Sequence, residues 1–456
     1  MAAFALDPVG ALRHFEPLGQ AVELARLSKH SHRTLVIWGP DYNRRFLMST
    51  KAMTTSGLWS LRSPPSSAQA ALRSNHPLKT HGSEHAAFSA LIDPYFNRAA
   101  IGRRFGEIRS QLVEEIRAWR PGVSDFYRLA RRLTERVAFS LLFGEEARDR
   151  FAEFGDLLHE HHRNNWRYVA HMLPVNLAGT PYGDALRSAE ALRDFIDGWR
   201  TEPGSDDPTR SLFGGLATSL RADGCPYSAA GVNGAVAMVS WLSYETMATA
   251  LNWAVFLLAQ HPAIQADLAD ELAQLGAVED LDADDLMSAP VLDAVVKESM
   301  RLITPVPLLS FRAVGDGDIA GHWYFHGTRI YVAAHLTHRL PDLYPAPDRF
   351  RPARWFGLRP TAYEYLPFGA GQRRCPGAWL ANTNLKLALA ALLSRFRPTP
   401  VAGARVDHRY AVVTMPWRGM PIDLAPREAA ARRLGDARSG SIFRLFTPEP
   451  DRGVRA

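Results

Sequence analysis

Cys375 has surroundings that suit a metal-binding thiolate. It lies in a loop of glycine and arginine residues, immediately before a helical pattern that begins at Ala378. Main-chain N–H groups of such a loop can donate hydrogen bonds to sulfur, and the N-terminus of the following helix favours negative charge. We therefore expect a lowered pKa for the Cys375 thiol. A lone cysteine is more often a small buried apolar residue, so this prediction depends on the loop around it.

Glu298 and Arg301 form a second pattern with possible chemistry. They lie three residues apart in an apolar helical segment that ends at the Pro305-Val306-Pro307 run. Residues with this spacing share one face of a helix, so the carboxylate and the guanidinium can pair. Most pairs of this kind are surface ion pairs with little effect on stability. Here, however, the flanking residues are apolar.

Glu245 and Thr246 form a third pattern, near the middle of the most apolar stretch, residues 229–260. An acid in the centre of a helix disfavours membrane insertion by about 3 kcal/mol. The stretch therefore predicts the central helix of a large soluble core rather than a membrane span. The acid and the hydroxyl either satisfy each other within that core or serve a proton transfer.

The composition limits the classes of protein that need to be considered. The chain has 456 residues, of which 46% are hydrophobic and 22% charged, with a formal net charge of +6. Two cysteines give no disulfide framework, so we expect a reducing cytoplasm, and the first residues contain no apolar signal segment. The positive charge could attract nucleic acid, but the arginines are scattered and no nucleic-acid motif is present.

The elements that must position these residues are mostly helices. Helical patterns punctuated by glycine and proline cover 125–143, 151–162, 183–200, 229–260 and 263–275. Strand-like segments occur at 34–38, 319–333, 398–401 and 422–424. The predicted fold class is mainly α with small β-sheets. After residue 426, an Arg- and Gly-rich stretch to residue 456 predicts a basic, poorly ordered tail.

The loop around Cys375 resembles the haem-ligand loop of the cytochrome P-450 family. The family pattern is Phe-x-x-Gly-x-(His/Arg)-x-Cys-x-Gly, and it is matched by Phe368, Gly371, Arg373, Cys375 and Gly377. The resemblance implies a single P-450 catalytic domain over residues 1–426 of the soluble bacterial type. It also implies haem b between the central long helix and the helix after the loop, with Cys375 as the metal ligand and Phe368, Gly369 and Gly377 beside it.

The same family has a Glu-x-x-Arg pair completed by an arginine in a later Pro-x-Arg-Phe segment. Glu298 and Arg301 match the pair, Arg349 in Pro347-Asp348-Arg349-Phe350 matches the later arginine, and Trp355 follows as expected. The resemblance implies that Glu298, Arg301 and Arg349 form a structural triad behind the haem loop. Its role would be folding and haem retention, not chemistry.

The central helix matches the family only in part. The pattern is (Ala/Gly)-Gly-x-(Asp/Glu)-Thr-(Thr/Ser), and Glu245 and Thr246 fit it, whereas Leu242, Ser243 and Met247 do not. In the family the threonine hydroxyl orders water near dioxygen, and the acid supplies protons. The missing glycine and the bulk of Leu242 over the haem face leave the type of reaction open.

Further roles follow from position in the family. Arg312 and Arg373 are expected to bind the haem propionates, because buried carboxylates need cationic partners. His85 matches a usual propionate-binding histidine, although the arginine expected four residues later is Ser89. Expected substrate contacts are Met238, Leu242, Val306, Leu308, Val413 and Thr414.

The implied activity is a monooxygenase that inserts one oxygen atom from dioxygen into an apolar small molecule. Electrons would come from NAD(P)H through an external ferredoxin or flavodoxin. The carrier would dock on a basic face around Arg373 and Arg374, with Arg349, Arg351 and Arg354 near in sequence. A membrane anchor is not expected. Two alternatives remain: oxidative coupling, cyclisation or peroxide use on the same haem, and a haem-binding protein without turnover.

Overall fold

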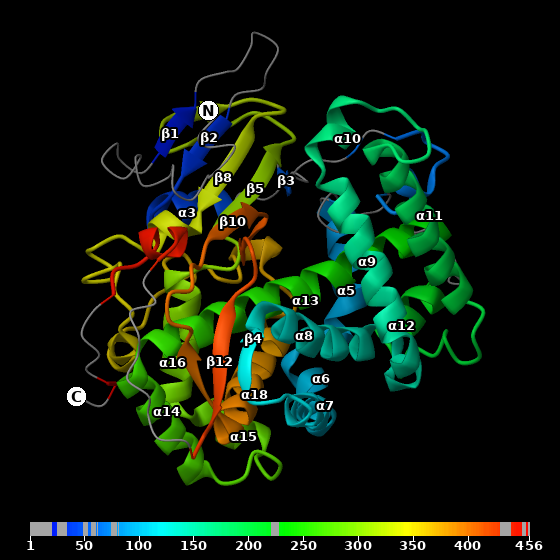
Figure 1. Cartoon of the computed structure of the whole chain (residues 1–456). Coiled ribbons are helices and arrows are strands. Elements are labelled where there is room, and N and C mark those ends of the chain that lie inside the picture. Colours follow the sequence, from blue (N-terminus) through cyan, green and yellow to red (C-terminus); the bar gives the residue numbers. More distant parts are fainter. Residues whose placement is uncertain are drawn as a thin grey trace. The chain divides into compact units, whose positions relative to one another are not determined.

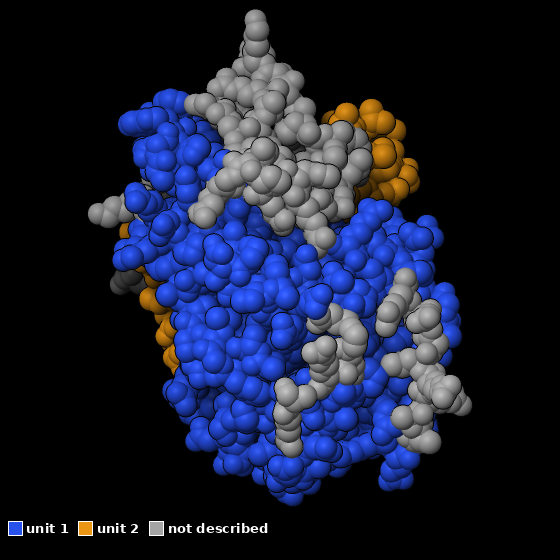
Figure 2. Space-filling model, turned by 90° about the vertical axis from the view of Figure 1, so that its left-hand side faces the viewer, with its two compact units in different colours: residues 1–53, 98–134, 245–456 blue, residues 54–97, 135–244 orange. Residues whose placement is uncertain are grey.

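The computed structural model describes residues 21–24, 34–48, 53–55, 61, 63–73, 80, 82–219, 228–428, 439–448 and 453–454. Contacts divide the chain into two compact units, which are coloured separately in Figure 2. Unit 1 contains residues 1–53, 98–134 and 245–456, and unit 2 contains residues 54–97 and 135–244. Helices dominate both units, as the sequence predicts, and the sheets are small.

Two helices contain residues that are assigned to both units. They are α8 (Phe126–Phe143) and α13 (Ala229–Gln260), and the bounds of α13 coincide with those predicted from the apolar stretch. The α13 side chains from Met247 to Ala259 are all buried, because this part of the helix is apolar on most sides and packs within the core. The remaining helices of unit 1 are α3 (Pro40–Met48), α6 (Arg98–Arg103), α7 (Phe105–Arg117), α14 (Pro262–Leu275), α15 (Ala283–Ser288), α16 (Pro290–Leu302), α17 (Ala334–Thr337) and α18 (Ala378–Arg395).

Unit 2 is built from α-helices and a short 3₁₀ helix. These are α4 (Ala68–Ala71), α5 (Gly82–Phe96), η3 (Glu145–Arg150), α9 (Phe151–Asn165), α10 (Tyr168–Met172), α11 (Pro181–Trp199) and α12 (Leu212–Ser219). Its core contains Phe143, Phe154 and Phe195, whose rings meet edge-on or tilted. Helix α11 begins where Thr180 accepts a hydrogen bond from the Gly183 N–H and Pro181 occupies the first turn.

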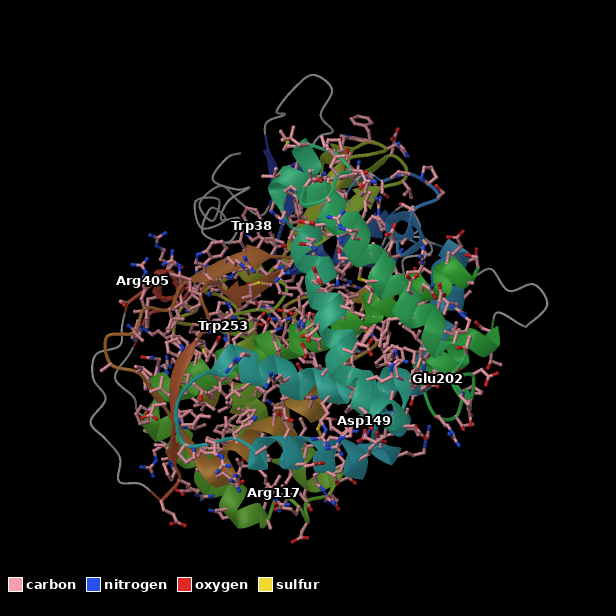
Figure 3. All side chains as sticks on the ribbon, turned by 45° about the vertical axis from the view of Figure 1, so that its right-hand side comes forward. Trp38, Arg117, Asp149, Glu202, Trp253 and Arg405 are labelled. Carbon is pink, nitrogen blue, oxygen red and sulfur yellow. The ribbon has the colours of Figure 1, made fainter. Side chains whose placement is uncertain are left out.

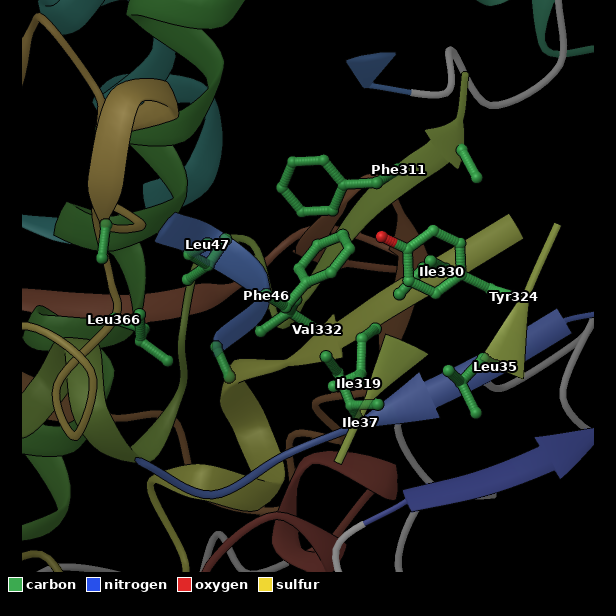
Figure 4. Packing of buried hydrophobic residues seen from close by; sticks show 13 residues of the cluster. Leu35, Ile37, Phe46, Leu47, Phe311, Ile319, Tyr324, Ile330, Val332 and Leu366 are labelled. Carbon is green, nitrogen blue, oxygen red and sulfur yellow. The ribbon is translucent and has the colours of Figure 1, made fainter. Parts of the chain in front are cut away.

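The largest sheet has the strand order β1-β2-β8-β5-β3. Its strands are β1 (Ala21–Leu24), β2 (Thr34–Ile37), β8 (Arg329–Ala333), β5 (Leu308–Ala313) and β3 (Met53–Thr55). β2 and β8 pair in parallel, whereas β5 pairs antiparallel to β8 with Leu308 opposite Ala333. Alternate side chains of β2, β5 and β8 pack with Phe46 and Leu47 of α3 in the cluster of Figure 4.

Three smaller sheets complete unit 1. β9 (Phe396–Pro400) and β4 (Gly122–Asp125) pair on either side of β12 (Pro421–Pro426). The two other sheets are the hairpins β6 (Gly317–Ile319)–β7 (His322–Tyr324) and β10 (His408–Ala411)–β11 (Val413–Pro416). The predicted strand segments at 319–333, 398–401 and 422–424 therefore fall on strands of the fold.

The core of unit 1 includes large aromatic side chains. Trp253 of α13 is fully buried, and its indole N–H donates to the Thr414 carbonyl at 2.5 Å. In Figure 3, Trp253 lies within the fold, whereas Arg117 and Arg405 lie toward its outside. Three short 3₁₀ helices, η4 (Pro352–Phe356), η5 (Gly371–Arg373) and η6 (Ser441–Arg444), lie in the remaining connections.

The last described segments, residues 439–448 and 453–454, require a correction to the predicted tail. Ile442, Leu445 and Phe446 are buried, and Phe446 contacts the ring of Phe256 on α13. The Leu445 carbonyl accepts a hydrogen bond from Arg339 at 2.5 Å. The basic composition suggested poor order, but this segment has apolar residues that pack on unit 1.

Within the described residues, no helix is both long enough and apolar enough to span a membrane.

Candidate functional site

The loop that carries Cys375 has a tight and specific backbone. The Cys375 N–H donates to the Phe368 carbonyl at 2.8 Å and closes the loop on itself. Gly369 and Gly371 have φ values of +66° and +69°, a region that other residues rarely adopt. A Cβ on Gly371 would also lie 2.3 Å from the Leu47 carbonyl oxygen at the end of α3. The glycines therefore allow the loop to pass directly over α3.

The Cys375 thiol does not have the lowered pKa that the sequence suggested. Burial raises its pKa above the ordinary value and outweighs the opposing effects of the Gly377 N–H and the Arg374 charge. The residue is nevertheless exposed. Nearby protein atoms therefore disfavour the charged form of the thiol, while part of the residue stays accessible to solvent. Such a thiol would lose its proton when it binds a metal ion.

A buried carboxylate behind this loop holds several segments together. Glu298 on α16 is 0% exposed. It accepts hydrogen bonds at 2.9–3.0 Å from the Arg301, Arg354 and Trp355 side chains and from the Arg351 N–H. Burial acts to raise the Glu298 pKa, but the charges and hydrogen bonds of Arg301 and Arg354 outweigh it, so the pKa is lowered.

The predicted triad of Glu298, Arg301 and Arg349 is therefore wrong in one member. The arginine that pairs with Glu298 beside Arg301 is Arg354, whose side chain is 9% exposed. Arg349 is exposed, and its main-chain carbonyl accepts a hydrogen bond from Arg301 at 3.2 Å. Arg354 was expected on a docking face. Arg354 directly precedes Trp355, and both side chains donate hydrogen bonds to Glu298. Its position next to Trp355 is the sequence signal that could have indicated this role.

His338 connects this cluster to the cysteine loop. Its carbonyl accepts a hydrogen bond from Arg301 at 2.8 Å, and its Nε2 accepts one from the Leu366 N–H at 2.8 Å. Burial, followed by the charges of Arg301 and Arg339, lowers the His338 pKa to about 3. The ring is therefore neutral at physiological pH and can accept from Leu366. Sequence reasoning missed His338, because nothing in its local pattern marks it.

The central helix α13 has one face that is only partly covered. Met238, Val239, Leu242, Ser243 and Thr246 are half-buried, while the neighbouring residues of the helix are buried. Their spacing places them on one side of a helix. Thr246 and two of the predicted substrate contacts, Met238 and Leu242, therefore lie on the same open face.

Glu245 lies on a different face of α13 and contacts α8. It is 4% exposed, accepts a short hydrogen bond from the Tyr127 hydroxyl, and lies 3.5 Å from Arg131 Nε. The sequence placed Glu245 and Thr246 together as a pair. The structure separates the directions of their side chains and supplies two partners for the acid that sequence reasoning missed.

Other predicted substrate contacts fall within the core. Leu308 packs with Val36, Trp38 and Tyr331, and it is 2% exposed. Val413 is 0% and Thr414 1% exposed, and the Thr414 N–H donates to the Pro305 carbonyl. These three residues are therefore core residues rather than part of an accessible surface, whereas Val306 is half-buried.

The predicted propionate ligands are charged side chains with reduced hydration. Burial lowers the pKa of Arg373, and burial followed by the charge of Arg329 lowers that of Arg312. Leu309, on the same strand as Arg312, would lie 3.7 Å from a Cβ on Gly369 of the loop. His85, on α5 of unit 2, lies 3.5 Å from Ser89 Oγ. Partly desolvated guanidinium groups are stabilised by anionic partners.

Comparison with known proteins identifies the family. A family model described as Cytochrome P450 matches residues 23–417. The chain belongs to the cytochrome P450 family. The Cys375 loop fits the haem of this family, because a sulfur ligand for iron and two cationic side chains lie along β5 and the loop.

Two relatives and one solved structure illustrate the similarity. Pentalenene oxygenase of Streptomyces avermitilis is 28% identical over 71% of this chain and 76% of its own. Cyclooctat-9-en-7-ol 5-monooxygenase of Streptomyces melanosporofaciens is 28% identical over 71% of this chain and 72% of its own. The retinoic acid-bound cyanobacterial CYP120A1 has a TM-score of 0.77 and 22% identity, and covers 93% of this chain and 96% of that one.

This P450 is therefore a monooxygenase with the general requirements of its family. It uses haem b and dioxygen and receives reducing equivalents from NAD(P)H through redox partners. The fold places the haem between the central long helix and the helix after the cysteine loop.

The Glu298 cluster generates a test that separates Arg354 from Arg349. Arg354→Ala removes a buried partner of Glu298, and we expect it to lower the free energy of unfolding by about 3 kcal/mol. The matched change Arg349→Ala leaves the main-chain carbonyl in place and should cost less than about 1 kcal/mol. Chemical denaturation of both variants measures this difference. Equal losses, or a larger loss for Arg349→Ala, would contradict the assignment.

Proposed function

We propose that Cys375 binds the haem iron and that this P450 inserts one oxygen atom from dioxygen into an apolar small molecule. The observation that carries the proposal is the loop itself. Its only cysteine stands where glycines shape the backbone and the Glu298 cluster, through His338, fixes the approach to the loop. A position held this firmly suits a metal ligand, because small displacements weaken coordination.

The residues around the cysteine divide the task of haem binding. The Gly377 N–H acts on the Cys375 sulfur and favours its anionic form. Arg312 and Arg373 would neutralise the propionates, and His85 would add a third contact. Phe368 and Gly369 would shape the loop beside the haem, and Leu242 would face it from α13. When bound, the haem supplies the oxygen chemistry, with electron density from the thiolate favouring cleavage of the O–O bond.

The open face of α13 supports a substrate and water site. Thr246 stands on this face among Met238 and Leu242, and its hydroxyl would hold a water molecule in position for proton transfer. Glu245, directly beside Thr246 in sequence, would supply the proton. We retain Met238, Leu242 and Val306 as substrate contacts, since all three are half-buried and apolar.

A terpenoid natural product is the substrate class that we favour. The relatives named for pentalenene and for cyclooctat-9-en-7-ol oxidise compounds of this class. The half-buried residues on the open face of α13 agree with an apolar substrate, because burial of apolar surface is the main source of its affinity.

An acidic ferredoxin or flavodoxin is the electron donor that we favour. Arg349, Arg351 and Arg374 are exposed near the cysteine loop in sequence. Arg354 no longer contributes to this face, since its charge is paired with Glu298. Complementary charges speed the encounter of two proteins and depend on ionic strength.

The Cys375 assignment predicts a spectroscopic signature. The reduced, carbon-monoxide-bound wild-type protein should show the strongly red-shifted Soret band of thiolate ligation. Cys375→Ser should lose this band, because a hydroxyl is a poor ligand for reduced iron. Cys225→Ser, at the other cysteine in the sequence, is the control and should retain the band. A wild-type spectrum typical of histidine ligation would refute the assignment.

The reaction itself is tested with labelled dioxygen. With a surrogate ferredoxin system, we expect a cyclic terpenoid to change the haem spin state on binding and then to gain one labelled oxygen atom. The altered α13 pattern makes coupling or ring formation the competing outcome. Substrate consumption without incorporated label would support that alternative and contradict oxygen insertion. Haem binding without any dioxygen consumption, across a terpenoid library, would indicate a non-catalytic protein.

The docking face predicts charge-dependent electron transfer. Arg374→Glu should reduce the rate of haem reduction by an acidic ferredoxin, and the effect should shrink as salt is raised. Arg418→Glu is the control, since Arg418 is exposed near the β11–β12 turn. Stopped-flow reduction measures both rates. Equal rates for the two variants at low salt would count against this face.

A further inference from the structure

The acid of the central helix belongs to a polar cluster buried between α13 and α8. Tyr127, near the start of α8, donates its hydroxyl hydrogen to Glu245 Oε1, and Arg131, one turn later, approaches Oε2. Burial, followed by the Glu245 carboxylate, raises the Tyr127 pKa well above its ordinary value. Tyr127 therefore stays protonated at physiological pH and holds the carboxylate as a permanent donor.

Two more polar side chains follow Glu245 on the same face of α13. Thr249 and Asn252 follow Glu245 by four and seven residues, so the three side chains share one face of the helix. Both are 0% exposed. Thr249 lies close enough to Tyr127 to oppose the rise in its pKa. Yet the geometry between the two hydroxyls is not that of a well-formed hydrogen bond, and Thr249 Oγ1 has no other partner among the described residues.

Asn252 presents the stronger anomaly. Neither its Nδ2 nor its Oδ1 has a hydrogen-bond partner among the described residues. Buried polar groups are almost always satisfied by protein or by ordered water. A site with several unsatisfied polar atoms close together is the kind of place where internal water binds.

We infer that ordered water binds the Asn252 amide and the Thr249 hydroxyl, and that Tyr127 links this water to Glu245 as a buried proton path. The inference deepens the proposed function, since it assigns a supply of protons to Glu245. In one concerted transfer, the Tyr127 hydroxyl proton moves to Glu245 Oε1 while a hydronium ion at Asn252 and Thr249, protonated from solvent, gives its excess proton to Tyr127 Oη. The tyrosine is unchanged, the carboxylate has gained one proton, and a neutral water molecule remains at Asn252 and Thr249.

Arg131 is a partner of Glu245 whose side chain is partly exposed to solvent. Its side chain is 28% exposed, whereas that of Glu245 is 6% exposed. Tyr127 is a positioning and relay residue in this arrangement, and Asn252 acts through the water that it binds.

The first test concerns the water and does not depend on turnover. A high-resolution crystal structure of the haem-loaded protein should show ordered water within hydrogen-bond distance of Asn252 and Thr249. Asn252→Leu should then lower the melting temperature, because the water loses a partner. A dry cavity at Asn252, together with a higher melting temperature of Asn252→Leu, would overturn the inference.

The second test concerns the relay. Tyr127→Phe and Asn252→Leu should each lower product formed per electron consumed by about tenfold. Peroxide release should rise and the solvent isotope effect should change, while substrate affinity from spin-state titration stays the same. Tyr344→Phe is the matched control, since it removes a hydroxyl that donates to the Glu364 carbonyl at 3.0 Å and has no hydrogen bond to Glu245 among the described residues. Unchanged coupling and isotope effect in Tyr127→Phe would refute the relay.

These outcomes are distinguishable from failure of the proposed function. Each variant should retain the red-shifted carbon-monoxide spectrum, because none of the changed residues touches the cysteine loop. If the wild-type protein lacked that spectrum, the haem assignment would fail, whereas the crystallographic test of the buried water would still give its own answer.

Discussion

The structure of unit 1 depends on one buried negative charge. Glu298 has no access to solvent, so its carboxylate would be very costly without partners. The partners come from its own helix and from the irregular segment that contains Arg351, Arg354 and Trp355. This requirement ties a segment with little regular structure to α16. It explains why so long an irregular stretch can hold one conformation.

The same charge acts on the cysteine loop through successive hydrogen bonds. Arg301 neutralises Glu298 and binds the His338 carbonyl, and the neutral His338 ring accepts from Leu366 shortly before the loop. Each step is buried, so each donor and acceptor has strong reason to keep its partner. At the end of this series, burial raises the pKa of the Cys375 thiol. The buried hydrogen bonds therefore hold in place the segment that leads into the loop.

Helix α13 presents the side chains of two neighbouring residues to different surroundings. Adjacent residues Glu245 and Thr246 point to different surroundings, because successive residues of a helix are about 100° apart. Thr246 faces the open side with apolar neighbours, and Glu245 faces buried polar groups on α8. The departures at Leu242 and Ser243 fall on the open side only. They can thus alter what the open side accepts without disturbing the polar contacts behind it.

Much of the fold could be predicted from periodicity, since α13 and the helices near 125–143 and 263–275 have clear apolar patterns and end signals. The cysteine loop was also readable, because its residues are contiguous. The partners of Glu298 and Glu245 could not be predicted from the sequence. The conformation of the loop brings Arg354, rather than Arg349, to the Glu298 carboxylate. Tyr127 lies 118 residues from Glu245 in the sequence. Leu308, Val413 and Thr414 are apolar or small, and such residues suit a core and a binding site equally well.

The described residues after β12 belong to the packed fold of unit 1. The family match stops at residue 417, yet Ile442, Leu445 and Phe446 are as deeply buried as the central helix. The Val454 N–H is bound to Asp267 on α14. An expression boundary chosen from the family match alone would strip aromatic side chains from α13 and leave Arg339 without one of its acceptors. A fused electron carrier should accordingly be joined after residue 454, where the last described contact is complete.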